Sequence, residues 1–117
     1  MVHGSGRTTT ILDREQLRDI TLDDPDLMRE IVSMLIDDTS RQIQLLDSAI
    51  RERDARQCMR LAHYSKGACA NVGANSAAAR FKRIEGNASS GDFAGCGGAL
   101  ANLAHEIDLL RAEAVDI

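Results

Sequence analysis

Apolar residues recur every three or four positions along most of this 117-residue chain, which is the spacing of amphipathic α-helices. The pattern predicts one short helix and four longer ones. They cover residues 14–20, 25–51, 54–72, 75–85 and 98–115. Long runs of β-branched residues are absent, so the pattern predicts an all-α fold.

Residues suited to helix ends mark several of these boundaries. Asp13 precedes the first helix and Gln16 follows three positions later, as in a capping box. Asp24 and Pro25 form a favoured start for the long second helix. Gly73 suits the left-handed position that ends the third helix.

Two glycine-containing segments are predicted to lie outside the helices. Residues 86–91 combine Gly, Asn and Ser and indicate a loop. Residues 95–98 are poor helix formers and predict a loose or irregular approach to the last helix. Short connections favour antiparallel neighbours, so we expect an antiparallel up-down four-helix bundle with a short extra N-terminal helix.

The apolar positions also indicate which side of each helix faces the core. Aromatic residues make up only 3% of the chain, so Leu, Ile, Val, Met and Ala must form that core. The apolar stripe of the second helix is wide, so this helix should touch two neighbours or leave apolar surface for a partner, with Met34 and Leu45 at the edge of the stripe. In the last helix the residues predicted to face inward are Leu100, Leu103, Ala104, Ile107, Leu110 and Ala114.

Composition excludes several classes of protein. A net charge of −4 and a pI near 5.3 argue against a nucleic-acid binder. No stretch of about 18 apolar residues exists, so no membrane span is expected. Residues 1–10 are polar and predict a flexible arm ahead of one domain at 11–117. Three cysteines without a Cys-x-x-Cys pair indicate reduced thiols in a cytoplasmic protein.

One histidine lies on the polar side of the third helix. With about 100° of rotation per residue, His63 falls roughly 150° from the centre of the apolar stripe. It is therefore predicted at the surface rather than in the core, and an idle surface histidine remains the ordinary alternative. The residues of the apolar stripe are Cys58, Leu61, Ala62, Ser65, Cys69 and Val72.

Lys66 and Gly67 follow His63 by three and four residues and share its face of the helix. Glycine inside a helix costs about 1 kcal/mol relative to alanine, and this cost is accepted where a side chain would obstruct. A cation beside an open imidazole suits a phosphoryl group, which carries nearly two negative charges. Taken singly, Gly67 also fits close helix packing, and Lys66 fits plain solubility.

A family resemblance rests on these residues. The pattern Ala62-His63, Lys66-Gly67 and Gly73-Ala74 resembles the signature of histidine-containing phosphotransfer (HPt) domains. The segment Phe81-Lys82-Arg83-Ile84-Glu85 is similar to the apolar-x-x-apolar-Glu ending of the helix that follows in that family. The likeness extends in outline over about residues 12–110, and it implies the same helical-bundle architecture.

The sequence departs from the family pattern in the Ala-rich stretch Ala77-Ala78-Ala79, where the family often carries larger residues, and at Ser65. Ser65 occupies a position that usually holds a large apolar residue. Since it lies on the core face, we expect its hydroxyl to bond back to the carbonyl of Leu61.

The resemblance implies a phosphorelay intermediate of two-component signalling. His63 would accept a phosphoryl group, through Nε2, from a receiver-domain aspartate or a kinase and pass it to another receiver. It implies that Lys66 stabilises the developing charge and that Gly67 leaves access to the ring. The implied partners are response-regulator receiver domains and a histidine or hybrid kinase. Mg²⁺ would come with the receiver, because the three histidines here show no metal-ligand spacing and no cofactor is expected.

The surface around His63 is the predicted contact for the receiver. The chain lacks a Gly-rich phosphate loop. It also lacks the acidic residue and the proline that follow the histidine in the dimerising helices of sensor kinases. Autonomous ATP-dependent kinase activity is therefore not expected. A monomer is expected, because the histidine face must stay open. The alternatives are a non-catalytic receiver-docking adaptor or inhibitor, and a helical bundle with an accidental motif. The predicted partner-binding residues are Arg56, Met59, Arg60, Tyr64, Ala70 and Met34.

Overall fold

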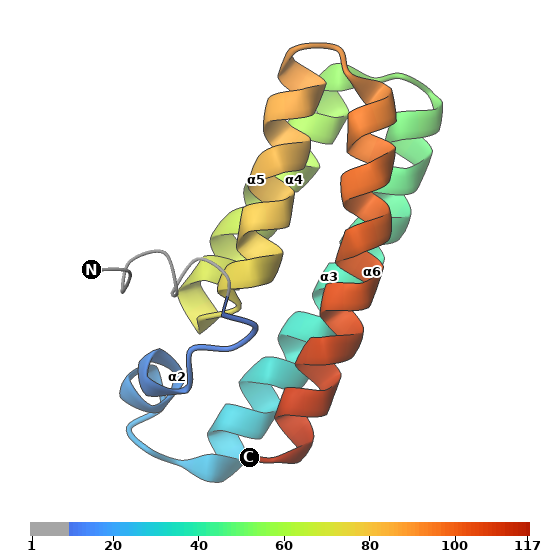
Figure 1. Cartoon of the computed structure of the whole chain (residues 1–117). Helices are drawn as coiled ribbons and strands as arrows, with labels where there is room; N and C mark the ends of the chain where they lie inside the picture. The colour runs from blue at the N-terminus through green and yellow to red at the C-terminus, as the bar shows by residue number, and fades with distance from the viewer. Residues whose placement is uncertain (1–9) are drawn as a thin grey trace, which may run out of the picture.

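The computed structural model describes residues 10–117, and these form five α-helices joined by short connections (Figure 1). The four long helices form a ring in which α3 contacts α4, α4 contacts α5, α5 contacts α6, and α6 returns to α3. This confirms the predicted up-down bundle with a short extra helix. Most of the predicted N-terminal arm, residues 1–9, lies outside the described residues. The helices are α2 (Arg14–Ile20), α3 (Pro25–Arg51), α4 (Ala55–Val72), α5 (Asn75–Ser89) and α6 (Phe93–Val115).

The core is almost entirely aliphatic, as the composition predicts. α2 contributes a single fully buried residue, Leu17, which anchors this short helix to the bundle. In the part of the chain that the structure describes, no helix is both long and apolar enough to cross a membrane. The largest fully buried side chains are Phe81, Leu17, Leu46, Ile84, Leu103, Leu110 and Val32.

Two helices are longer than the sequence pattern indicated. The predicted loop at 86–91 is wrong for residues 86–89, because α5 continues to Ser89 and buries Ala88, one turn beyond Ile84; residues 90 and 91 do connect the two helices. The predicted irregular segment at 95–98 is also wrong, because α6 begins at Phe93. The side chain of its N-cap Asp92 accepts a hydrogen bond from the backbone N–H of Gly95 at 2.8 Å. Core burial and capping together outweigh the poor helix propensity of the glycines.

The inward face of α6 differs from the prediction at one position. Leu100, Leu103, Ile107 and Leu110 are buried and Ala114 is partly buried, as expected, but Ala104 is exposed. The rotation of α6 turns Glu106 inward instead, where it is 7% exposed. Its Oε1 accepts from Arg80 Nε on α5 at 3.4 Å, which supplies the buried carboxylate with a cation.

α2 is joined to the end of α4 by a network that the sequence predicted only in part. The Asp13 side chain accepts from the Gln16 backbone N–H at 3.1 Å. The Gln16 side-chain amide donates to the carbonyls of Ala70 and Asn71, at the end of α4, at 2.8 and 3.1 Å. The Asp13 N–H donates to the Gly73 carbonyl at 2.8 Å. Gly73 has φ +95° and no room for a side chain, since a Cβ would lie 2.9 Å from the Asp13 carbonyl oxygen.

Candidate functional site

His63 lies near the middle of α4 with its side chain 69% exposed. The same helix buries Cys58, Ala62, Ser65 and Cys69 on its opposite side. The predicted separation of a core stripe from a histidine face is therefore observed. Leu61 and Val72, at the edges of the stripe, are only partly buried.

Glu85 of α5 joins His63 and Lys66 into one cluster. Its Oε2 lies 3.0 Å from His63 Nδ1, and its Oε1 accepts from Lys66 Nζ at 2.8 Å. The side chains of Glu85 and Lys66 are 26% and 30% exposed, so both are partly sheltered from solvent. Glu85 closes the motif quoted from the sequence, but its role in holding the histidine was missed.

The charge state of Glu85 follows from this geometry. The hydrogen bond from Lys66 lowers the pKa of the Glu85 carboxyl; partial burial opposes the shift, and the hydrogen bond from His63 adds to the lowering. Glu85 is therefore ionised near neutral pH and can only accept hydrogen bonds. Consequently Nδ1 of His63 carries the proton, and the lone pair of the imidazole lies on Nε2.

Gly67 leaves open space one turn beyond the histidine. A Cβ placed on it would meet no atom within 4 Å. Close helix packing is thus excluded as the reason for a glycine at this position. The glycine instead leaves no side chain protruding beside the imidazole, which suits the approach of a large partner.

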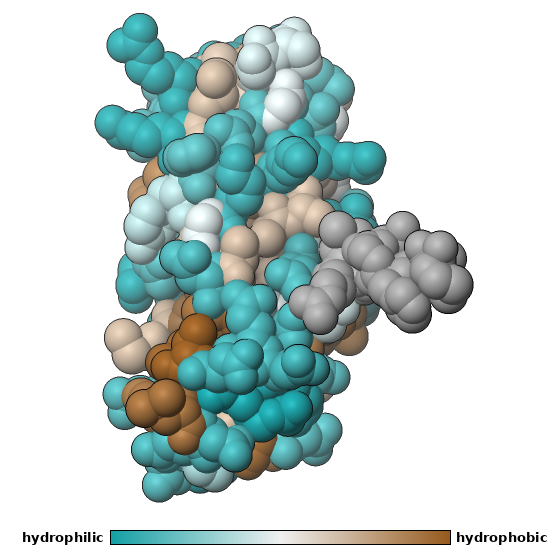
Figure 2. Space-filling view, turned by 90° about the vertical axis from the view of Figure 1, so that its left-hand side faces the viewer, coloured by the Kyte–Doolittle hydropathy of each residue, from teal (hydrophilic) through white to brown (hydrophobic). Residues whose placement is uncertain are grey.

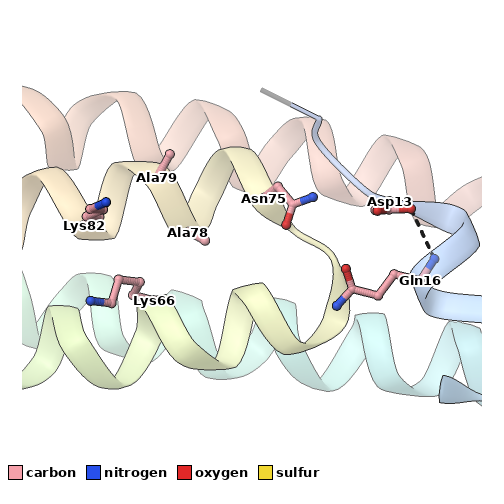
Figure 3. A pocket seen from close by; sticks show the side chains of 7 residues that line it. All are labelled: Asp13, Gln16, Lys66, Asn75, Ala78, Ala79 and Lys82. Carbon is pink, nitrogen blue, oxygen red and sulfur yellow. Dashed lines mark hydrogen bonds between the residues drawn. The ribbon is translucent and has the colours of Figure 1, made fainter. Parts of the chain in front are cut away.

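A groove borders this cluster on the side of α5 (Figure 3). We call it the α4–α5 groove; its volume is about 480 Å³. Lys66 and Lys82 lie at one end, and the residues of α2 lie at the other. Lys66 therefore belongs both to this groove and to the ion pair with Glu85. The lining residues are Asp13, Gln16, Lys66, Asn75, Ala78, Ala79 and Lys82.

The predicted partner-binding residues are distributed around His63. Arg56, Arg60 and Ala70 are exposed on α4, and Met59 is partly buried. Arg60 hydrogen-bonds Gln57, one turn back, and so is held away from the histidine.

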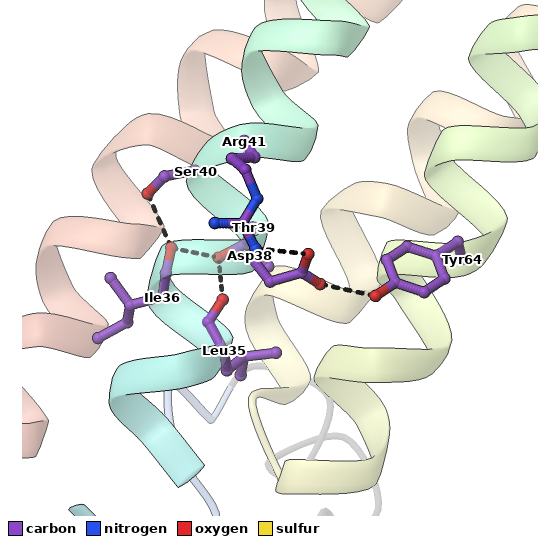
Figure 4. Close-up of polar contacts among 7 residues, drawn as sticks. All are labelled: Leu35, Ile36, Asp38, Thr39, Ser40, Arg41 and Tyr64. Carbon is purple, nitrogen blue, oxygen red and sulfur yellow. Dashed lines mark hydrogen bonds and ion pairs between the residues drawn. The ribbon is translucent and has the colours of Figure 1, made fainter. Parts of the chain in front are cut away.

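The remaining two predicted contacts, Tyr64 and Met34, line one groove between α3 and α4. Their exposed fractions are 53% and 63%. The Tyr64 hydroxyl donates to Asp38 Oδ2 at 2.9 Å, a contact between α4 and α3 that the sequence analysis missed (Figure 4). The sequence could not indicate which aspartate bonds to Tyr64, because residue type and local spacing do not distinguish Asp38 from its exposed neighbour Asp37.

Two further expectations concern buried groups of α4. The Ser65 hydroxyl does not bond to Leu61, because its Oγ is buried and has no hydrogen-bond partner within residues 10–117; that prediction is wrong. Cys58 and Cys69 are buried and unpaired, in agreement with the sequence. Burial raises the pKa of the Cys69 thiol to about 12 and keeps it unreactive.

Other candidate chemistry is not found among residues 10–117. No group of three or more His, Cys, Asp or Glu side chains there is arranged to hold a metal ion. His105 is exposed on α6, which lies diagonally across the bundle from α4.

Comparison with known proteins agrees with this geometry. The model of the Hpt domain family matches residues 30–113, which include α4 and α5. No curated protein sequence matches the chain. Among solved structures, the histidine-containing phosphotransfer protein B (HptB) of Pseudomonas aeruginosa PAO1 is 22% identical, with a TM-score of 0.82. The match covers 91% of this chain and 92% of that one, and at this identity it shows a shared fold. The family match over most of its length shows that this chain belongs to the Hpt domain family.

Proposed function

We propose that His63 is the phosphoacceptor of this HPt domain. HPt domains act in two-component phosphorelays, where they exchange phosphoryl groups with receiver domains and kinases. The observation that carries the assignment is the cluster around His63: an exposed imidazole, with Nδ1 bonded to Glu85 at 3.0 Å and Lys66 on the other oxygen of that carboxylate at 2.8 Å. Such an arrangement leaves Nε2 as the free nucleophile.

The proposed transfer is a displacement at phosphorus. The Nε2 lone pair of His63 attacks the phosphorus of a receiver aspartyl phosphate, and the bond between phosphorus and the aspartate oxygen breaks. A phosphorus–nitrogen bond has then formed, and the receiver regains its carboxylate. The positive charge that develops on the imidazole is stabilised by the Glu85 carboxylate through Nδ1–H. The reverse sequence passes the group to a second receiver.

Lys66 balances the charge of the transferred group. Before transfer, the neutral imidazole, the Lys66 cation and the Glu85 anion sum to zero. A phosphoryl group adds nearly two negative charges, so it competes with Glu85 for Lys66. Two unit charges 4 Å apart attract by about 1 kcal/mol in water and by about 4 kcal/mol near a protein surface. Since Lys66 is 30% exposed, the lower part of that range applies.

The receiver is the partner that supplies Mg²⁺ in this scheme, together with its own acidic pocket. Access for so large a partner requires the low surface at Gly67. Docking would involve Arg56, Met59, Arg60 and Ala70 around the histidine. Tyr64 and Met34 extend the same surface towards α3.

We assign this chain no ATP-dependent kinase activity of its own, and we expect a monomer whose histidine face is free. The three cysteines are buried and unpaired, which supports a reducing, cytoplasmic location.

Phosphoryl transfer to the wild type and to His63→Gln tests the assignment. Both proteins are mixed with a panel of phosphorylated receiver domains, and the products are separated under alkaline conditions, in which phosphohistidine survives. His105→Gln is the matched control, because it removes another exposed histidine. Acid-labile phosphate on the wild type and the control, but not on His63→Gln, is the expected result. Receiver binding without transfer to any of the three proteins would instead identify a docking adaptor.

A further inference from the structure

The α3–α4 groove is lined on the α4 side by Tyr64, the residue that follows His63. Its volume is about 560 Å³, and it extends between the two helices towards the end of α4. A protein that approaches His63 from this side must therefore contact the groove. The lining residues are Ile31, Met34, Leu35, Asp37, Asp38, Arg41, Tyr64, Ala68, Asn71 and Val72.

Polar contacts fix the tyrosine wall of this groove. Asp38 accepts from the Tyr64 hydroxyl at 2.9 Å through Oδ2 and lies 3.5 Å from Arg41 Nη2 through Oδ1. The ring of Tyr64 is thus held towards α3 although the residue is 53% exposed. A rigid aromatic side chain with its hydroxyl satisfied is a good anchor for a protein partner, because little conformational entropy is lost when it is covered.

Exposed apolar residues continue the groove along α3. Leu27, Met34 and Leu45 are 37%, 63% and 50% exposed. Separations of seven and eleven residues place all three on one side of the helix. Ile20 and Leu22 are also exposed, at 49% and 90%. Figure 2 shows apolar surface gathered at the end of the bundle where α2 lies. Exposed apolar surface that gathers in this way is typical of an interaction site.

The unbalanced charge at the groove is negative. Asp38 is engaged by Tyr64 and Arg41. Asp37 is exposed and lines the groove, and its carboxylate makes no hydrogen bond or ion pair with any residue of 10–117. By contrast, the cation closest to the histidine, Lys66, lies on α4 and is paired with Glu85. The α3 side of the surface is therefore suited to a partner with a positive charge.

We propose that the α3–α4 groove selects the receiver that exchanges phosphate with His63. The occupant is a receiver surface with an apolar centre, which covers Met34 and Tyr64, and a Lys or Arg that pairs with Asp37. This inference rests on the proposed phosphotransfer function, and it adds Asp37 as a residue that determines partner choice. Charge complementarity of this type chiefly affects which partners associate, and how fast.

Charge reversal at Asp37 tests the inference. Transfer to the wild type, Asp37→Lys and Met34→Ala is followed at increasing concentrations of a phosphorylated receiver domain that is active on the wild type. The matched control is Asp108→Lys, which makes the same charge change on α6, the helix that lies diagonally across the bundle from α4 and His63. Each protein is also labelled with phosphoramidate, a small donor that reacts with the imidazole without docking.

Asp37→Lys is expected to raise the half-saturating receiver concentration about tenfold, with the maximal rate and phosphoramidate labelling unchanged. Met34→Ala is expected to raise it several-fold, and Asp108→Lys less than twofold. The wild-type value should also rise with salt more steeply than that of Asp37→Lys. Equal half-saturating concentrations for Asp37→Lys and Asp108→Lys would overturn the groove assignment but leave phosphotransfer intact. Phosphoramidate labelling without transfer from any receiver would instead overturn the proposed function, and this inference with it.

Discussion

Glu85→Gln separates the charge of this carboxylate from its shape. Glutamine has nearly the same size and can still accept a hydrogen bond from Nδ1 of His63, but it carries no negative charge. In the proposed transfer the imidazole becomes positive as the bond at Nε2 forms. The carboxylate therefore stabilises the transition state more than the ground state, and only such a difference accelerates the reaction.

The exposure of the pair sets the size of the effect. A hydrogen bond to a charged group contributes about 1.5–3 kcal/mol when sheltered, whereas exposed ion pairs contribute about 0.2–1 kcal/mol. The His63 and Glu85 side chains are 69% and 26% exposed, so the lost stabilisation should lie near 1 kcal/mol. Since about 1.4 kcal/mol corresponds to a factor of ten in rate, transfer to Glu85→Gln should be about three- to tenfold slower.

Labelling of His63 at saturating phosphoramidate measures this rate without any contribution from receiver docking. The matched control is Glu113→Gln, which removes a carboxylate from an ion pair with Arg14 at 3.0 Å, away from the histidine. The control should label at the wild-type rate. A wild-type or faster rate for Glu85→Gln would refute the reasoning, because it would show that Glu85 acts only by occupying Lys66.

The pH dependence gives an independent check on Glu85. Its pKa in the folded state is lowered, mainly by the hydrogen bond from Lys66. The resulting stabilisation of the fold is complete above the unfolded-state value of 4.5 and is lost as the pH falls through the lower folded-state value. Since Glu85 stays ionised above that value, the ratio of the wild-type and Glu85→Gln labelling rates should be constant from pH 8 to 9.

The other predictions concern the tyrosine and three helical glycines. Tyr64 is the only tyrosine, and the hydrogen bond to Asp38 raises its pKa above 10.0. Ultraviolet titration should therefore give a midpoint above 10.0 for the wild type and a lower midpoint for Asp38→Asn. Equal midpoints for the two proteins would contradict the hydrogen bond. Gly67→Ala should increase the free energy of unfolding in urea by about 0.5–1 kcal/mol, because its Cβ meets nothing within 4 Å; a loss of stability would contradict this. Gly98→Ala should stabilise similarly, whereas Gly95→Ala should not, because its Cβ would meet the carboxylate that caps α6.

Local periodicity was sufficient to predict the helices that hold the site. The bounds of α3 and α4, the exposure of His63 and the left-handed Gly73 all depend on residues close together in sequence, and the structure agrees with each. Helix propensity predicted the wrong helix ends where tertiary contacts determine where a helix begins or stops. Burial of Ala88 extends α5 through Gly86, and the cap at Asp92 starts α6 before its glycines.

The contact between His63 and Glu85 depends on the register of two helices, yet the sequence contains the information that fixes it. α4 and α5 are joined by the tight turn at Gly73 and Ala74. In such an antiparallel hairpin, residues equally far from the turn lie at the same level. His63 is ten residues before Gly73, and Glu85 is eleven residues after Ala74, so their positions along the chain are enough to pair them.

The same rule does not find the contact between Tyr64 and Asp38. Tyr64 is ten residues after Asp54, but Asp38 is fourteen residues before Glu52. The difference of four residues is about one helical turn, and the connection between α3 and α4 includes Arg53 at φ +57°. A tight turn thus makes the chemistry of the histidine predictable from sequence. The groove that we propose to select the partner depends on a looser turn, and its residues could be identified only from the folded chain.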